Sequence, residues 1–392
     1  MTQGARAPVA NVDLDDLERD PHSILADLRR RHPAVWVPAL DGWMVLTRAA
    51  VLAAMRDDAG LTVDDPRFST GRITGPSMLS TDAPEHVRHR GPFARAFRLD
   101  AIRARFAAVA DAEAPRLVAE FAARGSADLR AELAGPLAAR MMLVALGLDG
   151  PDAGDVLDWY ARIVDAVTRI TAGEDVPADG RDAYRALGDA IRASLAADHD
   201  GGTLLASALG DADDLTEDEL VANAAVLLFG GVETTDGMIS NLLHHLLAEP
   251  GLLQRVAADD ALAAGAIEES LRLEPAAAVV DRYATRDLAI GDARIRMGDL
   301  VVLSMASANR DEAVFADPDR FDPARANARL HTSFATGPHV CLGMHLARLE
   351  ARAALRALAV LPGLRADPAA PSAPTGLVFR KPPVVRALWD AA

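Results

Sequence analysis

The sequence contains a single cysteine, Cys341, among its 392 residues, and this excludes an internal disulfide framework. It contains no window of about 18 apolar residues, and its first residues hold no apolar run, so we expect neither a membrane span nor a signal peptide. Aromatic residues make up only 4% of the chain, whereas alanine and leucine are frequent, which favours helices. We therefore expect a helix-rich, cytoplasmic protein that does not associate with membranes.

Positive charge is also scarce, because 41 basic residues stand against 57 acidic ones and the formal net charge is −16. Such a chain should be soluble and should repel nucleic acid. The chain lacks internal repeats and a long Ser/Gly linker, although it exceeds the ~250–300 residues at which one core usually stops growing. We expect one large enzyme-like domain over residues 1–392, mainly α-helical with small β-sheets.

Three segments read as β-hairpins. The first spans residues 34–47, where Asp41-Gly42 separates two apolar runs and so gives a strong turn signal. The others are residues 295–304, with a turn at Gly298-Asp299, and residues 378–388. Three helices carry most of the functional argument. One begins at the capping box Thr216-x-x-Glu219 and runs over residues 220–249, another ends at residue 274 before Pro275, and the third follows Cys341 to about residue 360.

The segment around the cysteine reads Phe334-x-x-Gly-x-His339-x-Cys341-x-Gly343 and leads into a helix. A cysteine at a helix N-terminus faces unpaired N–H groups, which lower its pKa and favour the thiolate that binds metals. Gly343 would let a flat group approach, and Phe334 could cover the sulfur. The alternative is a buried structural cysteine, which composition alone favours.

Three further patterns lie upstream. Gly230-Gly231-Val232-Glu233-Thr234-Thr235 interrupts the long helix, and could be no more than a polar break at its surface. Glu269 and Arg272 share a helix face, a spacing that usually marks a surface ion pair. Asp82-Ala-Pro-Glu-His86-x-x-x-Arg90 places two basic side chains on one face of a helix start, which could equally be a solvated basic face.

Together and in this order, the four patterns resemble those of the cytochrome P-450 family. The resemblance implies a prism-shaped, mainly α-helical fold around one haem b, with Cys341 as the axial iron ligand. It implies that four basic side chains hold the haem propionates: His86, Arg90, Arg282 and His339. It further implies that Gly231 opens the helix toward the haem, that Glu233 and Thr234 deliver protons, and that Glu269 and Arg272 are structural.

The resemblance implies a monooxygenase that uses O2 and takes electrons from NAD(P)H through a separate ferredoxin reductase and ferredoxin. We expect a monomer that oxidises a medium-sized apolar or aromatic small molecule, in a pocket lined by Met78, Leu79, Leu228, Phe229, Ala278, Val279 and Phe379. A basic segment at residues 86–105 would dock the acidic ferredoxin. A peroxide-driven haem-thiolate enzyme and a non-catalytic haem protein remain as alternatives.

Overall fold

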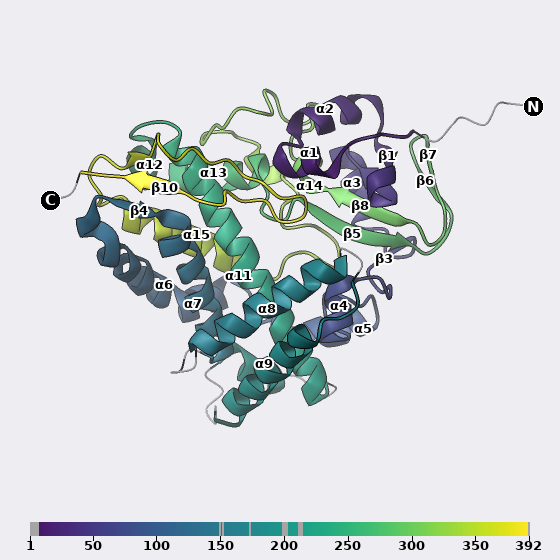
Figure 1. Cartoon of the computed structure of the whole chain (residues 1–392), viewed down its shortest axis with the longest axis horizontal. Helices are drawn as coiled ribbons and strands as arrows, with labels where there is room; N and C mark the ends of the chain where they lie inside the picture. Colours follow the sequence, from purple (N-terminus) through teal and green to yellow (C-terminus); the bar gives the residue numbers. More distant parts are fainter. Residues whose placement is uncertain are drawn as a thin grey trace, which may run out of the picture.

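Helix α11 (Glu217–Leu247) crosses the computed structural model, and the other elements pack around it (Figure 1). The structure describes residues 8–148, 150, 153–171, 174–197, 203–210 and 215–390. The Thr216 hydroxyl accepts the Glu219 N–H while the Glu219 carboxylate accepts the Thr216 N–H, so the predicted capping box is confirmed. Residues on all sides of α11 are buried, as expected for a helix at the centre of a large core.

The helices before α11 occupy the first half of the chain. They are α1 (Leu14–Arg19), α2 (His22–Arg31), α3 (Arg48–Ala54), α4 (Ser69–Thr74), α5 (Glu85–Ala94), α6 (Leu99–Phe121), α7 (Gly135–Leu146), α8 (Ala153–Thr171), α9 (Ala178–Ala197) and α10 (Leu204–Gly210). After α11 come α12 (Leu252–Ala257), α13 (Asp260–Leu273), α14 (Met305–Ala308) and α15 (Met344–Leu358). Short 3-10 turns lie at Pro38–Leu40, Ala122–Arg124 and Ala328–Leu330, and one π-helical turn, η3, lies at Arg130–Ala134.

Within the described part of the chain, the strands form three small sheets. The largest has the order β1-β2-β8-β5-β3, built from β1 (Ala34–Val37), β2 (Gly42–Val45), β8 (Leu300–Ser304), β5 (Val279–Ala284) and β3 (Leu61–Thr62). The second contains β4 (Ser126–Asp128), β10 (Arg386–Leu388) and β9 (Arg365–Ala366), and the third pairs β6 (Leu288–Ile290) with β7 (Ala293–Ile295). The fold is therefore mainly α-helical with small sheets, as predicted.

Strands β1 and β2 confirm the first predicted hairpin, because Trp36 pairs with Trp43 in antiparallel register. The other two hairpin predictions are wrong. Strand β8 pairs in parallel with β2 and antiparallel with β5, while β7 pairs with β6, so Gly298-Asp299 turns the chain between two sheets. Strand β10 pairs with β4 and β9, which lie elsewhere in the sequence, so residues 378–388 do not form a hairpin.

The main hydrophobic core lies between α6, α7, α11, α13 and α15, and two smaller clusters flank the five-stranded sheet. Helix α13 ends at Leu273 and α15 ends at Leu358, close to the predicted ends. Among the described residues, no helix is long and apolar enough to cross a membrane.

Candidate functional site

Cys341 lies immediately before α15, and two backbone N–H groups point at its sulfur. These are the N–H groups of Gly343, which is the N-cap residue, and of Met344. The Cys341 N–H donates to the carbonyl oxygen of Phe334 at 2.8 Å, which closes the loop. A Cβ added at Gly343 would meet nothing within 4 Å, so the surface next to the sulfur is open. This geometry matches the arrangement predicted from the loop sequence.

The prediction of a lowered thiol pKa is wrong for the polypeptide alone. Burial raises the pKa of Cys341, while the two N–H groups and the charges of Arg90 and Arg348 oppose that shift without cancelling it. The polypeptide alone therefore does not favour the thiolate form of Cys341. A coordinating metal would favour the thiolate, since a thiol that binds a metal cation releases its proton.

Two residues of the loop have a positive φ. Gly337 has φ 77°, and a Cβ there would lie 2.6 Å from the carbonyl oxygen of Met55, so only glycine fits. Ala335 has φ 55°, in the region that L-residues adopt at a cost. Ala335 adopts this left-handed conformation despite its Cβ.

His86 and His339 form a buried aromatic pair beside the loop, with ring centroids 4.3 Å apart. His86 is 3% exposed, and its Nε2 atom is buried without a hydrogen-bond partner. Burial, followed by the charges of His339 and Arg90, lowers the pKa of His86 to about 4. A buried nitrogen with no partner indicates that a polar group from outside the polypeptide belongs here.

Asp82 holds this cluster together, a role that the sequence motif did not suggest. Its carboxylate lies 2.9 Å from His339 Nε2, and it accepts hydrogen bonds from the Thr62 hydroxyl at 2.5 Å and the Val63 N–H at 3.0 Å. Burial raises the pKa of Asp82, but these hydrogen bonds hold it well below its usual range. Asp82 thus fixes the orientation of His339.

Two arginines approach the same region from different elements. Arg90 on α5 donates to the Val340 carbonyl oxygen at 2.6 Å, next to the cysteine. Arg282 on β5 is 7% exposed and donates to the carbonyl oxygen of Asp281 at 2.7 Å. Burial lowers the pKa of both guanidinium groups, and no carboxylate is hydrogen-bonded to either one among the described residues. Both arginines can therefore bind an external anion.

The two glycines of α11 play different parts. A Cβ at Gly230 would meet nothing within 4 Å, and Gly230 is exposed although it lies in the middle of a buried helix. A Cβ at Gly231 would lie 2.2 Å from the Met142 sulfur, so Gly231 permits close packing against α7. Gly230, and not the predicted Gly231, therefore faces open space. The Thr234 hydroxyl donates to the Gly230 carbonyl oxygen at 2.5 Å.

Glu233 lies within a charged network that the sequence did not predict. One carboxylate oxygen is 2.6 Å from Lys381 Nζ, and the other accepts from the Tyr160 hydroxyl at 3.4 Å. Lys381 Nζ is also 2.7 Å from the Asp236 carboxylate. Lys381 lies 148 positions along the chain from Glu233, so no local spacing could have signalled this contact.

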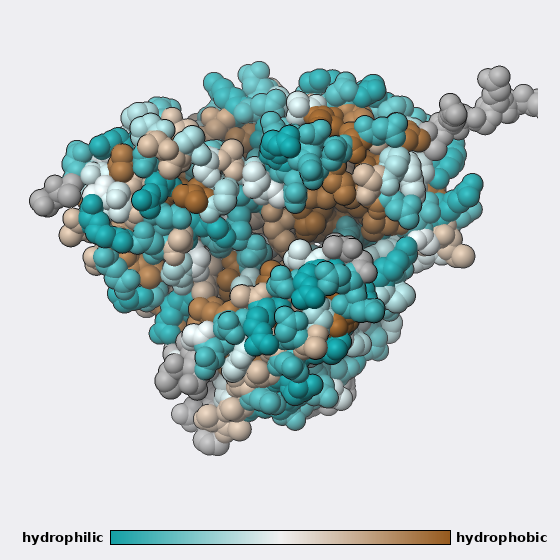
Figure 2. All heavy atoms as spheres, viewed as in Figure 1, coloured by the Kyte–Doolittle hydropathy of each residue, from teal (hydrophilic) through white to brown (hydrophobic). Residues whose placement is uncertain are grey.

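The predicted pocket residues divide into two groups. Phe229 and Phe379 meet edge to face with ring centroids 5.5 Å apart, and both are partly exposed, as is Leu79. Four others are buried in packed regions of the structure: Met78, Leu228, Ala278 and Val279. Ala278 belongs to the cluster formed with α1 and α2 residues, so it packs away from the aromatic pair. Figure 2 shows a hollow lined with hydrophobic residues between α8 and the sheet that contains β5 and β8.

Glu269 and Arg272 are fully buried, with bonds of 2.8 and 2.9 Å between the guanidinium and both carboxylate oxygens. Glu269 also accepts from Arg325 at 2.8 Å. Arg272 donates to the carbonyl oxygens of Asn309 and Pro318. The pair ties α13 to the long segment before the cysteine loop, which is the arrangement that a structural role requires.

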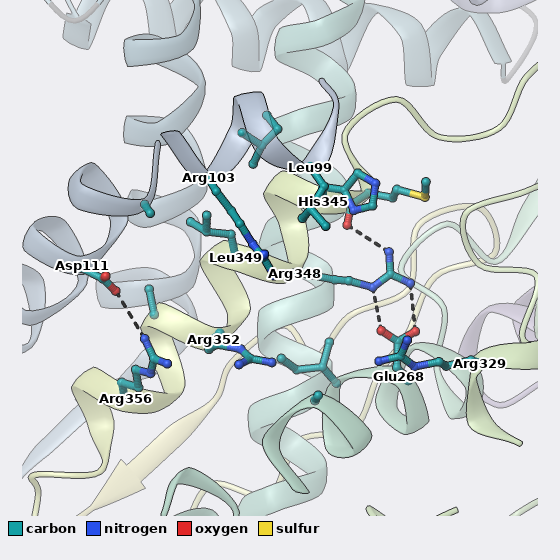
Figure 3. Close-up of a pocket in the computed structure, with 16 residues that line it drawn as sticks. Leu99, Arg103, Asp111, Glu268, Arg329, His345, Arg348, Leu349, Arg352 and Arg356 are labelled. Atoms are coloured by element: carbon teal, nitrogen blue, oxygen red, sulfur yellow. Dashed lines mark hydrogen bonds and ion pairs between the residues drawn. The ribbon is translucent and has the colours of Figure 1, made fainter. Parts of the chain in front are cut away.

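The basic segment 86–105 does not form one continuous positive surface. His86, His89 and Arg90 point inward, and Arg88 pairs with Glu85 and Glu219. A different positive surface exists between α6, α13 and α15, around a pocket of about 710 Å³ (Figure 3). Its basic lining residues are Arg103, Arg329, His345, Arg348, Arg352 and Arg356. Of the basic residues in the predicted segment, only Arg103 lines this pocket.

The residues present fit a haem. The Cys341 thiol can ligate iron, the open surfaces at Gly230 and Gly343 leave room for a flat ring, and the unpartnered His86 nitrogen and the two arginines can bind carboxylates. Among described residues, no cluster of three or more His, Cys, Asp or Glu side chains could hold a metal ion in another way. The site is therefore that of a protein that binds iron within a macrocycle.

Comparison with known proteins agrees. The Cytochrome P450 family model matches residues 261–359. The cyclomarin C epoxidase CymV of Salinispora arenicola is 33% identical over 360 residues, covering 87% of this chain and 88% of that one. The cytochrome P450 monooxygenase PikC of Streptomyces venezuelae is 32% identical, covering 98% and 94%. The crystal structure of CalO2 superposes with a TM-score of 0.88 at 31% identity, covering 98% and 100%.

The chain belongs to the cytochrome P450 family. It is a monooxygenase, an oxidoreductase whose cofactor is haem iron.

Proposed function

We propose that this single-domain enzyme inserts one atom of O2 into a medium-sized apolar or aromatic intermediate of secondary metabolism, with haem b as the cofactor. When bound, the haem supplies the redox chemistry that activates O2, and a thiolate ligand favours O–O cleavage. Cys341 would be that ligand. The carboxylates of the haem would be held by His86, Arg90, Arg282 and His339.

The protein's own groups would then manage protons. Thr234 carries a hydroxyl on the open side of α11 and is hydrogen-bonded to the Gly230 carbonyl oxygen. Glu233 is adjacent and 19% exposed at its side chain, so it can exchange protons with solvent. We assign Thr234 to proton transfer near the reacting atoms and Glu233 to its resupply. Retention of both groups favours O2-driven turnover over a peroxide-driven reaction.

The substrate class rests on one observation, the partly exposed contact between Phe229 and Phe379 next to Gly230. Ligand pockets are lined mostly by apolar and aromatic side chains with few polar groups, so this pair of phenylalanines suits an apolar or aromatic ligand. Relatives named for the epoxidation of cyclomarin C and for hydroxylation and epoxidation of mycinamicin IV support a natural product as substrate.

Electrons would arrive from NAD(P)H through a separate reductase and an acidic ferredoxin. We place the ferredoxin at the arginine-lined pocket of Figure 3, which lies beside the helix that follows Cys341. There Arg348 lies over the Phe334 ring, with its Cζ 4.4 Å from the ring centroid. Arg103 and Arg329 line the pocket and form no ion pair with a carboxylate among the described residues, so both can meet acidic groups of a ferredoxin.

Reconstitution with ferredoxin, reductase and NAD(P)H under ¹⁸O2 tests the proposal. Candidate substrates come from a screen of apolar natural products, in which binding is measured by the shift of the haem iron from low to high spin. The expected result is a product that carries one ¹⁸O atom, at a rate that falls as salt screens the docking surface. Product formation from peroxide alone, with none from the electron-transfer chain, would replace the proposal with a peroxide-driven enzyme. Tight binding only by charged sugars or nucleotides would overturn the substrate class.

A further inference from the structure

Lys381 is the only lysine in the sequence, although arginine provides the other 40 basic residues. Its side chain is 15% exposed, and its ammonium lies between two carboxylates of α11, 2.6 Å from Glu233 and 2.7 Å from Asp236. A lysine ammonium is a compact charge with three rotatable donors, so it can bridge two carboxylates that a flat guanidinium would engage differently.

The backbone that carries Lys381 is held firmly against α11. Asn241 on α11 donates to the Arg380 carbonyl oxygen at 3.0 Å, and the Arg380 N–H donates to the Ala276 carbonyl oxygen at 2.9 Å. A Cβ at Gly237 would lie 3.7 Å from Lys381 Cβ and 2.9 Å from Ala276 Cβ. Glycine at position 237 thus permits the close approach of Lys381 to α11.

The groups that face this ammonium come from three elements, α11, η3 and α8. Arg130 on η3 donates to Asp236 at 3.2 Å and therefore competes for that carboxylate. Tyr160 on α8 donates to Glu233 at 3.4 Å, and burial together with the charge of Glu233 raises the pKa of its hydroxyl above the ordinary range. Asp236 thus has two cationic partners, whereas Lys381 is the only cationic partner of Glu233 among the described residues.

The same short segment also reaches the proposed substrate site. Phe379, two residues before Lys381, contacts Phe229, and residues 375 and 381 are joined by a β-bridge. A displacement of Phe379 by a bound substrate would therefore act on the segment that holds the Glu233 carboxylate. Residues 379–381 therefore connect the proposed substrate pocket to the Glu233 carboxylate, at a place separate from Cys341.

On the basis of the proposed function, we propose that Lys381 is a positioning residue of the oxygen-activation site. It holds the Glu233 carboxylate next to that of Asp236 and sets how readily the Glu233 carboxylate supplies protons to Thr234. Substrate contact at Phe379 adjusts this hold through the intervening residue.

Because the chain has one lysine, lysine labelled with ¹³C at Cε and ¹⁵N at Nζ gives a single Cε–Nζ signal in the haem-loaded enzyme. We expect that signal to shift in the Glu233→Gln variant and again on addition of a substrate that binds the pocket. It should not move in Arg386→Met, a matched control that removes an exposed cation five residues further along. An unchanged lysine signal in Glu233→Gln overturns the proposal, even in a fully active enzyme.

Turnover gives the second readout. In Lys381→Met, we expect product formed per NAD(P)H consumed to fall about tenfold with a larger solvent isotope effect, because proton delivery by a positioned side chain contributes roughly 10²–10⁴-fold. Lys381→Arg should restore part of the yield, and Arg386→Met should match the wild type. Full coupling and an unchanged isotope effect in Lys381→Met contradict the proposal. Absence of product from the wild-type enzyme instead contradicts the proposed function.

Discussion

Phe229 on α11 and Phe379 on the C-terminal segment meet edge to face, with ring centroids 5.5 Å apart and planes at 77°. They are 150 positions apart in the chain, and each is partly exposed. The contact joins the central helix to the segment that pairs with residue 277. It therefore defines one wall of the proposed substrate site.

Replacement of Phe379 by alanine should weaken binding of an apolar ligand. An aromatic pair contributes about 0.5–1.5 kcal/mol beyond its buried area, so we expect the dissociation constant to rise roughly three- to tenfold. The spin-state shift during titration measures this constant. Val378→Ala is the control, since Val378 is exposed and adjacent. Equal affinities for wild type and Phe379→Ala would remove Phe379 from the site.

Glu269→Gln should strongly destabilise the fold. Breaking a buried ion pair leaves an uncompensated charge and costs about 3–5 kcal/mol of unfolding free energy. Asp182→Asn is the matched control, because Asp182 and Arg185 have the same i, i+3 spacing but are exposed. That change should cost no more than about 1 kcal/mol. Denaturant unfolding measures both, and similar losses in the two variants would contradict the assigned structural role.

Glu274 should make stability depend on acid pH. Burial raises the pKa of Glu274, but the bond to His22 and the charges of Arg380 and Arg310 lower it to about 2 from the usual 4.5. The folded pKa is depressed, so this stabilisation is present above about 4.5 and is lost as pH falls toward 2. Unfolding free energy should fall less steeply over that window in Glu274→Gln than in wild type. The exposed control Asp58→Asn should keep the wild-type dependence of the unfolding free energy on pH. The same dependence in Glu274→Gln would contradict the assigned effect of His22, Arg380 and Arg310 on Glu274.

The arginine-lined pocket predicts a specific effect on electron transfer. Arg103→Glu should slow reduction by ferredoxin about tenfold at low salt, and the difference should shrink as salt increases, because surface charges mainly steer encounter. Stopped-flow reduction measures the rate. Arg185→Glu changes the net charge equally, but Arg185 does not line the pocket. A similar loss in both variants would point to net charge and not to a docking site.

Local signals in the sequence identified the elements better than their partners. The Thr216 capping box and the first hairpin encode their own geometry within a few residues, and both are confirmed, although the turn lies at residues 38–41 and Gly42 already belongs to β2. Strand β8 has no such signal, since its neighbours β2 and β5 are chosen by packing across the whole sheet. The turn at Gly298 is present but joins strands of different sheets.

The site shows the same division. Spacing within one motif singled out Cys341, Glu233 and Thr234 as candidates, because each motif folds as a single local unit. It did not reveal Asp82 as the partner of His339 or Lys381 as the partner of Glu233, since both contacts span more than 140 residues. The one available signal for Lys381 was its being the only lysine in the chain. Spacing also could not show which of the two glycines of α11 faces open space, because that depends on how Met142 packs against Gly231.

The carbon monoxide difference spectrum of the reduced, haem-loaded protein tests most directly whether Cys341 is the axial ligand. We predict a Soret band at the position of an intact thiolate adduct in the wild type, and loss of that band in Cys341→His with haem still bound. A wild-type Soret band at the position of a neutral-ligand adduct, or an intact thiolate band in Cys341→His, would contradict the assignment.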